Sequence, residues 1–153
     1  MRRQNAIFAE RDGGDAEFDT VVYVNVLEHI EDDRGELRLM HRALRPGGRV
    51  CLFVPALRWL MSDHDRAIGH VRRYERAELR DKVREAGFEI ERLHFFDSAG
   101  TLAWWLCMRV LKLPLRGGSV DVYDRVAVPL LRAVESRLRP PLGKNLLLVA
   151  RRA

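Results

Sequence analysis

The hydrophobic pattern of the first third of the chain predicts two buried strands joined by a helix. Residues 18–26 and 50–54 are nearly continuous apolar runs rich in β-branched side chains, which is typical of parallel strands covered on both faces. Between them, Asp33 and Glu36 have the spacing of a capping box, and apolar residues follow at helical intervals. The turn Pro46-Gly47-Gly48 is expected to stop this helix, so the order predicts a β-α-β unit.

The pattern changes after the second predicted strand. Residues 57–71 show no sustained period and are rich in His, Asp and Gly, and loops of this length inside a domain are usually functional or mobile. Residues 75–86 have the spacing of an amphipathic helix, which Gly87 closes in the usual position after a helix end. Residues 88–96 follow as a third predicted strand.

The last third of the chain predicts two helices and a final strand. Ser98 can cap a helix over residues 99–111, and apolar residues recur every fourth position over 122–138. Pro129 should kink or split this second helix, and residues 146–150 form the last strand. Residues 1–17 have no clear period, so we interpret them as a loop or as the remnant of an upstream element.

Polar side chains follow each of the first two predicted strands. Asn25, Glu28 and His29 come directly after the first strand, and the segment 63–74 follows the second. In open α/β sheets, ligands bind at the carboxyl ends of the strands. If the two strands are parallel, both clusters must converge on one edge of the sheet, which we expect to hold a site.

Two short motifs resemble those of class I S-adenosylmethionine (SAM)-dependent methyltransferases. They are Phe18-Asp19-x-Val21 followed by the run from Val26 to His29 (Val-Leu-Glu-His), and Leu44-x-Pro46-Gly47-Gly48. In that family the first marks the fourth strand and the second marks the turn into the fifth. The resemblance implies an α/β fold that is the C-terminal part of a Rossmann-like, doubly wound sheet. It would contain strands four to seven, with the last strand antiparallel and inserted between five and six.

The family's glycine-rich cofactor loop has no counterpart in this sequence, because none of the eleven glycines forms a G-x-G. We therefore interpret residues 18–153 as a partial, truncated methyltransferase domain. The resemblance implies methyl transfer from SAM to oxygen, nitrogen or carbon of a small molecule. The first alternative is a non-catalytic remnant or partner subunit that keeps half of the sheet. The second, a nucleotide-binding enzyme such as a dehydrogenase, is disfavoured because it would need G-x-G-x-x-G.

The resemblance also implies roles for individual residues. Asn25, Val26 and Glu28 would lie near the cofactor, and His29 would face the cleft. The run from Gly69 to Tyr74 (Gly-His-Val-Arg-Arg-Tyr) resembles one subgroup of small-molecule methyltransferases. His29 and His70 are the candidate catalytic residues, since histidine can accept a proton at neutral pH. The candidate substrate-binding residues are Asp65, Arg72, Arg73 and Tyr74.

Structural alternatives stay open for most of these residues. Asp65 can pair with an arginine and hold the loop, while Tyr74 packs beneath the next helix. Glu28 can be an acid favoured by a helix start, and His29 a packing residue. Related enzymes that methylate ubiquinone precursors carry E-x-x-E-H with a divalent metal, but Asn25 replaces the first acid here, so the sequence predicts no metal.

Composition adds few constraints on partners. The net charge is +5, but the arginines are scattered beside acidic residues, which disfavours nucleic acid binding and leaves peripheral membrane contact open. Cys51 and Cys107 form no C-x-x-C or zinc spacing, and no signal peptide is visible, so we expect a cytoplasmic protein. Trp104 and Trp105 would serve core or homodimer packing, or form a wall for a hydrophobic or lipid-linked substrate.

Overall fold

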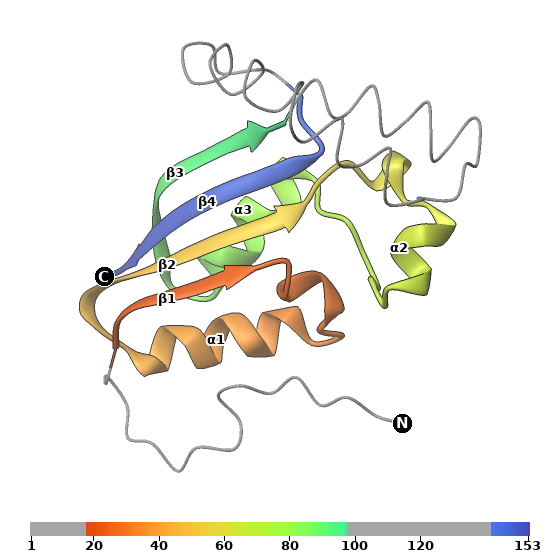
Figure 1. Ribbon diagram of the computed structural model, residues 1–153. Coiled ribbons are helices and arrows are strands. Elements are labelled where there is room, and N and C mark those ends of the chain that lie inside the picture. Colours follow the sequence, from red (N-terminus) through yellow and green to blue (C-terminus); the bar gives the residue numbers. More distant parts are fainter. Residues whose placement is uncertain (1–17, 98–141) are drawn as a thin grey trace, which may run out of the picture.

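A four-stranded mixed sheet forms the centre of the molecule in the computed structural model, which describes residues 18–97 and 142–153 (Figure 1). Its strands lie in the order β1-β2-β4-β3. Their bounds are β1 Phe18–Val24, β2 Leu44–Pro55, β3 Phe88–Phe96 and β4 Asn145–Arg152. β1 and β2 are parallel, and β4 is antiparallel to both β2 and β3. The predicted α/β architecture is confirmed, including an antiparallel last strand between the second and third.

β1 is shorter than the sequence predicted. It ends at Val24 rather than at Val26 because Asn25 has a φ of +51°. This left-handed conformation turns the chain out of the strand, and asparagine tolerates it better than most residues do. The backbone N–H of Asn25 still donates to the carbonyl of Phe53 at 2.9 Å, which anchors the turn to β2.

We expected the Pro46-Gly47-Gly48 segment to end the helix. It is instead an irregularity within β2. The helix α1 (Asp33–Ala43) ends before it, and β2 begins at Leu44. The pairing with β1 shifts between Phe18↔Leu44 and Thr20↔Arg49, so the extra residues bulge out of the ladder. Gly47 has a φ of +78°, a conformation that glycine adopts without strain.

The predicted capping box of α1 is wrong by one residue. The N-cap is Asp32, whose side chain accepts a hydrogen bond from the backbone N–H of Gly35. Asp33 and Glu36 are instead buried. Glu36 accepts a 2.5 Å hydrogen bond from the hydroxyl of Tyr23 on β1, so its side chain ties the helix to the sheet.

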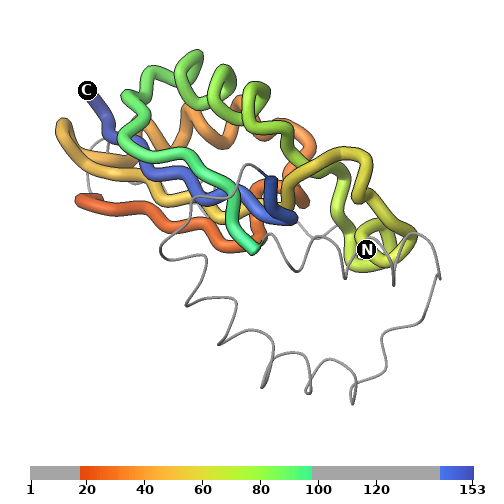
Figure 2. Tube along the Cα trace, turned by 90° about the horizontal axis from the view of Figure 1, so that it is seen from above, coloured from red at the N-terminus to blue at the C-terminus, as the bar shows by residue number. Residues whose placement is uncertain are grey.

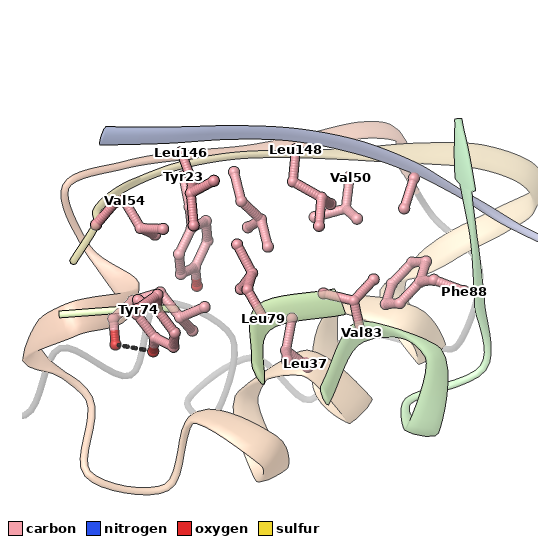
Figure 3. Close-up of a cluster of buried hydrophobic side chains, with 14 of the residues drawn as sticks. Tyr23, Leu37, Val50, Val54, Tyr74, Leu79, Val83, Phe88, Leu146 and Leu148 are labelled. Atoms are coloured by element: carbon pink, nitrogen blue, oxygen red, sulfur yellow. Dashed lines mark hydrogen bonds between the residues drawn. The ribbon is translucent and has the colours of Figure 1, made fainter. Parts of the chain in front are cut away.

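The core lies between the sheet and two helices, α1 and α3 (Arg76–Glu85), which cover the same face (Figure 2). Leu37 of α1 and Leu79 and Val83 of α3 point towards the inward residues of the strands, such as Val50 and Leu148 (Figure 3). All five side chains are buried, so these contacts fix the helices against the sheet.

The segment after β2 has more structure than the sequence indicated. It contains the 3-10 turn η2 (Arg58–Leu60) and the short helix α2 (Asp63–Ala67), and a similar turn η1 (Leu27–His29) follows β1. The predicted helices over 99–111 and 122–138, with Trp104, Trp105 and Cys107, lie outside the described residues. Among residues 18–97 and 142–153, none of the helices has the length and apolar content to cross a membrane.

Candidate functional site

The two polar clusters meet at the carboxyl ends of β1 and β2. Backbone hydrogen bonds fix the approach: the N–H of Val71 donates to the carbonyl of Glu28 at 2.9 Å, and a parallel bridge joins Ala56 to Tyr74. The segment after β2 is thereby held against the turn after β1. This placement confirms that the strand-tip residues and the loop lie on the same side of the sheet.

His29 and His70 are in direct contact. Their ring centroids lie 4.7 Å apart with an interplanar angle of 75°, an edge-to-face arrangement. The Nδ1 atom of His29 lies 2.9 Å from the carbonyl oxygen of Gly69. A carbonyl can only accept a hydrogen bond, so this nitrogen carries the proton and Nε2 is left with a lone pair.

Glu28 lies beneath the two histidines and is fully buried. Neither oxygen of its carboxyl group has a hydrogen-bond partner, and Oε1 is 3.6 Å from Nε2 of His70. Burial raises the pKa of Glu28 to about 7, against the opposing effects of its own backbone and of Arg73. An unpartnered buried carboxyl group is costly, because it has lost its hydration without a replacement.

Asp65 orients His70 from the opposite side of the ring. Its Oδ1 atom lies 3.0 Å from Nδ1 of His70 and 2.7 Å from the guanidinium of Arg73, while Oδ2 accepts a hydrogen bond from the hydroxyl of Ser62. Burial alone would raise the pKa of Asp65, but hydrogen bonds from Arg73 and Ser62 hold it below its usual range.

An ionised Asp65 can only accept, so Nδ1 of His70 carries the proton and Nε2 points its lone pair at Glu28. Burial lowers the pKa of His70, and the neighbouring Asp65 opposes this only in part. A neutral His70 can therefore accept a proton or bind a cation through Nε2.

A second buried network fixes the loop from below. Oδ2 of Asp33 lies 2.5 Å from the guanidinium of Arg72 and 2.6 Å from Nζ of Lys82, and it accepts a 2.9 Å hydrogen bond from the hydroxyl of Tyr74. Arg72 also donates to the carbonyl of Glu31 at 2.7 Å. These contacts join α1, the loop and α3 at one carboxylate.

Three of the four residues predicted to bind substrate pair with other buried residues of the chain. Asp65, Arg73 and Tyr74 are buried, and they pair with each other or with Asp33, as the structural alternative expected. Arg72 keeps a quarter of its side chain exposed. Asn25 is exposed and Val26 half-buried at the tip of β1, at the same edge as the histidines.

Sequence reasoning missed Asp33 and Lys82 as parts of this site. The sequence predicts Asp33 as part of a capping box, and Lys82 lies on a helix whose other charged residues are exposed or half-buried. An apolar neighbour at helical spacing, Leu79, is the only local sign that Lys82 lies on the inner face of α3.

Comparison with known proteins points to one family. A family model described as "Methyltransferase domain" matches residues 2–93. Comparison with curated proteins gives no match.

Solved structures share the fold. The chain resembles the complex of the Haloferax volcanii Trm112 methyltransferase activator with a protein described as a methyltransferase (17% identity, TM-score 0.57, covering 95% of this chain and 58% of that one). It also resembles an S-adenosylmethionine-dependent methyltransferase of Mesorhizobium loti (19%, TM-score 0.54, 90% and 63%). A third similar structure is a Burkholderia thailandensis 1,6-didemethyltoxoflavin-N1-methyltransferase with bound S-adenosylhomocysteine (22%, TM-score 0.52, 94% and 47%). The chain thus spans less than two thirds of each of these three structures.

Proposed function

Because the chain belongs to the methyltransferase-domain family, we propose that it takes part in SAM-dependent methylation of a small-molecule acceptor at oxygen, nitrogen or carbon. The observation that carries the proposal is the contact between His29 and His70, with Glu28 beneath them, at the carboxyl edge of the parallel strands. Ligands of open α/β sheets bind at this edge. Asn25 and Val26 follow the end of β1, at this same edge, which supports a role for them in the proposed site.

The residues divide into two groups in this proposal. Asn25 and Val26 contact the cofactor, while His29 and His70 face the acceptor and accept its proton as the methyl group is transferred. Transfer from a sulfonium needs little besides positioning and a base, so few catalytic groups are required. Glu28, expected at the cofactor, has its carboxyl group directed at His70, which supports a role on the acceptor side.

The four loop residues shape the acceptor side. Arg72, whose side chain is partly exposed, can contact a carboxylate or phosphate of the acceptor. The other three residues position the site without touching the acceptor. Asp65 orients the ring of His70, and Arg73 and Tyr74 hold the loop that carries His70.

Product formation tests the proposal. The purified chain is incubated with SAM at high concentration and a panel of phenols and amines, and S-adenosylhomocysteine is measured. We expect His29→Gln and His70→Gln to lower the rate about 100-fold, which is the effect of losing a general base. His64→Gln, in the same loop but outside the cluster, should retain the rate. Absence of S-adenosylhomocysteine with every acceptor would favour the alternative of a non-catalytic remnant or partner subunit.

Partners and location are part of the proposal. The Haloferax volcanii structure is a complex with an activator, which supports a role for a protein partner here too. The proposal also includes a homodimer, a hydrophobic or lipid-linked acceptor and peripheral membrane contact. The apolar run that contains Trp104 and Trp105 supports these three features. The proposed location is cytoplasmic, in keeping with the free thiol of Cys51.

A further inference from the structure

We propose that Glu28, His29 and His70 bind a divalent transition-metal ion of the Zn²⁺ type. Each residue offers one ligand atom, and these atoms all lie within 4.8 Å of one another. Two imidazole nitrogens and one carboxylate oxygen are a donor set that suits Zn²⁺ and similar ions better than Mg²⁺ or Ca²⁺, which prefer oxygen alone.

The separations fit the coordination sphere of such an ion. Metal–ligand bonds of about 2.0–2.2 Å in a tetrahedral arrangement place neighbouring ligand atoms about 3.4 Å apart. Nε2 of His70 and Oε1 of Glu28 are already 3.6 Å apart. His29 is only half-buried, and a shift of up to about 1.4 Å there would bring ligand atoms that lie within 4.8 Å of one another to this separation.

Both histidines are oriented as metal ligands are. Nδ1 of His70 is held by the carboxylate of Asp65 at 3.0 Å, and Nδ1 of His29 by the carbonyl of Gly69 at 2.9 Å. Ligand histidines almost always donate their other ring N–H to such a group, which fixes the tautomer and raises the basicity of the ligating nitrogen. Both Nε2 atoms are therefore the free ones.

Glu28 supplies an independent observation. Its side chain is fully buried, and both carboxyl oxygens lack a hydrogen-bond partner. Among the buried polar residues of the described chain, it is the one whose carboxyl group has no partner at either oxygen. A bound cation would provide the missing partner, because it replaces the hydration that the carboxylate lost on burial.

Sequence analysis predicted no metal because Asn25 stands where related enzymes have an acid. The structure provides a different third ligand: His70 arrives from the loop after β2, which chain direction brings to the same edge of the sheet. Three protein ligands leave at least one coordination position open, as in catalytic rather than structural zinc sites. If the proposed function holds, the open position would take the acceptor atom and lower its pKa, and with the ion bound the two histidines would act as its ligands in place of accepting the proton themselves.

Metal titration of the full 153-residue chain tests the inference. Any affinity tag is cleaved and the protein stripped with a chelator, and then Zn²⁺ is titrated by calorimetry and Co²⁺ by visible absorption. We expect one ion per chain and a Co²⁺ spectrum of a site with fewer than six ligands. Glu28→Gln and His70→Gln should weaken binding at least 10-fold, since each removes a ligand.

Two matched controls and one variant of a half-buried ligand make the outcome decisive. His64→Gln and Glu31→Gln change the same residue types outside the cluster and should bind as the wild type does. His29→Gln lies at the half-buried position, where folding is spared, and should also weaken binding at least 10-fold; circular dichroism checks the fold of each variant. Failure to bind one ion, or equal binding by His29→Gln and the wild type, would overturn the inference.

This readout needs neither SAM nor an acceptor, so the two proposals fail separately. Stoichiometric metal binding without S-adenosylhomocysteine formation supports the metal site and contradicts the methyl transfer. Methyl transfer by a metal-free, chelator-treated chain would contradict a part for the metal in the reaction, whereas the metal site itself stands or falls by the titration.

Discussion

Asp33 is the residue on which three elements depend. Its carboxylate accepts hydrogen bonds or ion pairs from Lys82, Arg72 and Tyr74, and its side chain is 4% exposed. Removing one member of a buried ion pair leaves the partner charges uncompensated, which costs about 3–5 kcal/mol. We expect Asp33→Asn to lower the free energy of unfolding by about 3 kcal/mol, measured by urea denaturation. Asp19→Asn, which breaks an exposed pair with Arg45, should change it by less than about 1 kcal/mol.

The same carboxylate predicts a pH dependence. Burial would raise the pKa of Asp33, but hydrogen bonds from Lys82, Tyr74 and Arg72 outweigh it and hold the pKa below its usual range. Its stabilising contribution is therefore present above the unfolded-state pKa of about 3.9 and is lost as the pH falls through the lower folded-state value. The stability difference between wild type and Asp33→Asn should shrink below about pH 4. A constant difference down to pH 3 would contradict this account.

At this scale the sequence predicts some contacts and not others. The meeting of His29 and His70 follows from chain direction, because both come after the carboxyl ends of neighbouring parallel strands. The pairing of Asp33 with Lys82 joins residues 49 positions apart, and no local pattern encodes it. An acid at a helix start is expected to cap the helix, and only the packing of α3 shows that this one is buried.

Elements follow the hydrophobic pattern, and their ends follow backbone geometry. The strands and the order of the sheet could be predicted, the first from apolar runs and the second from the family resemblance. The end of β1 depends on the positive φ of Asn25, and the start of β2 depends on a register shift around Gly47. Both depend on local backbone dihedral angles, which the spacing of hydrophobic residues does not predict.

Glycine is required at Gly47 for its backbone conformation alone, and at Gly87 also because a side chain would meet a neighbour. Both have positive φ, +96° and +78°, but a Cβ at Gly87 would lie 2.9 Å from Nε2 of His41, whereas nothing lies within 4 Å at Gly47. His41 packs edge-to-face on Phe88 at 5.0 Å, so it cannot move freely. We expect Gly47→Ala to lower the free energy of unfolding by about 1 kcal/mol, which is the cost of a left-handed backbone conformation for a residue with a Cβ. Gly87→Ala should cost about 1 kcal/mol more in urea denaturation; equal losses would contradict the steric part.

The whole molecule has an apolar edge. Among the described residues β1 pairs only with β2, and on its outer face Val22 and Val24 are 60% and 57% exposed. Edge strands with exposed apolar residues associate with other chains. We expect concentration-dependent self-association in sedimentation velocity, which Val22→Lys with Val24→Lys abolishes. Ile68→Lys, at an apolar residue that is 49% exposed but away from the edge, should not change it. A monomer at all concentrations would contradict the prediction.

Cofactor affinity is the property that most depends on the molecule as a whole. The family resemblance implies that a glycine-rich loop holds the amino-acid part of SAM and that an acid after the second strand holds the ribose. Neither motif has a counterpart in this sequence, so in the function proposed above the tip of β1 around Asn25 is the cofactor contact that remains. Each missing polar contact is worth about 0.5–1.5 kcal/mol, so several together weaken binding by orders of magnitude.

We therefore expect the 153-residue chain to bind SAM weakly or not at all in titration calorimetry. S-adenosylhomocysteine, which lacks the transferred methyl group and the sulfonium charge, is the matched ligand and should behave alike. An Asn25→Ala variant tests whether the residual heat arises at the tip of β1, since it should remove whatever binding remains. Micromolar binding by a monomer, unchanged in Asn25→Ala, would mean that other residues hold the cofactor and that the carboxyl edge of β1 serves the acceptor alone.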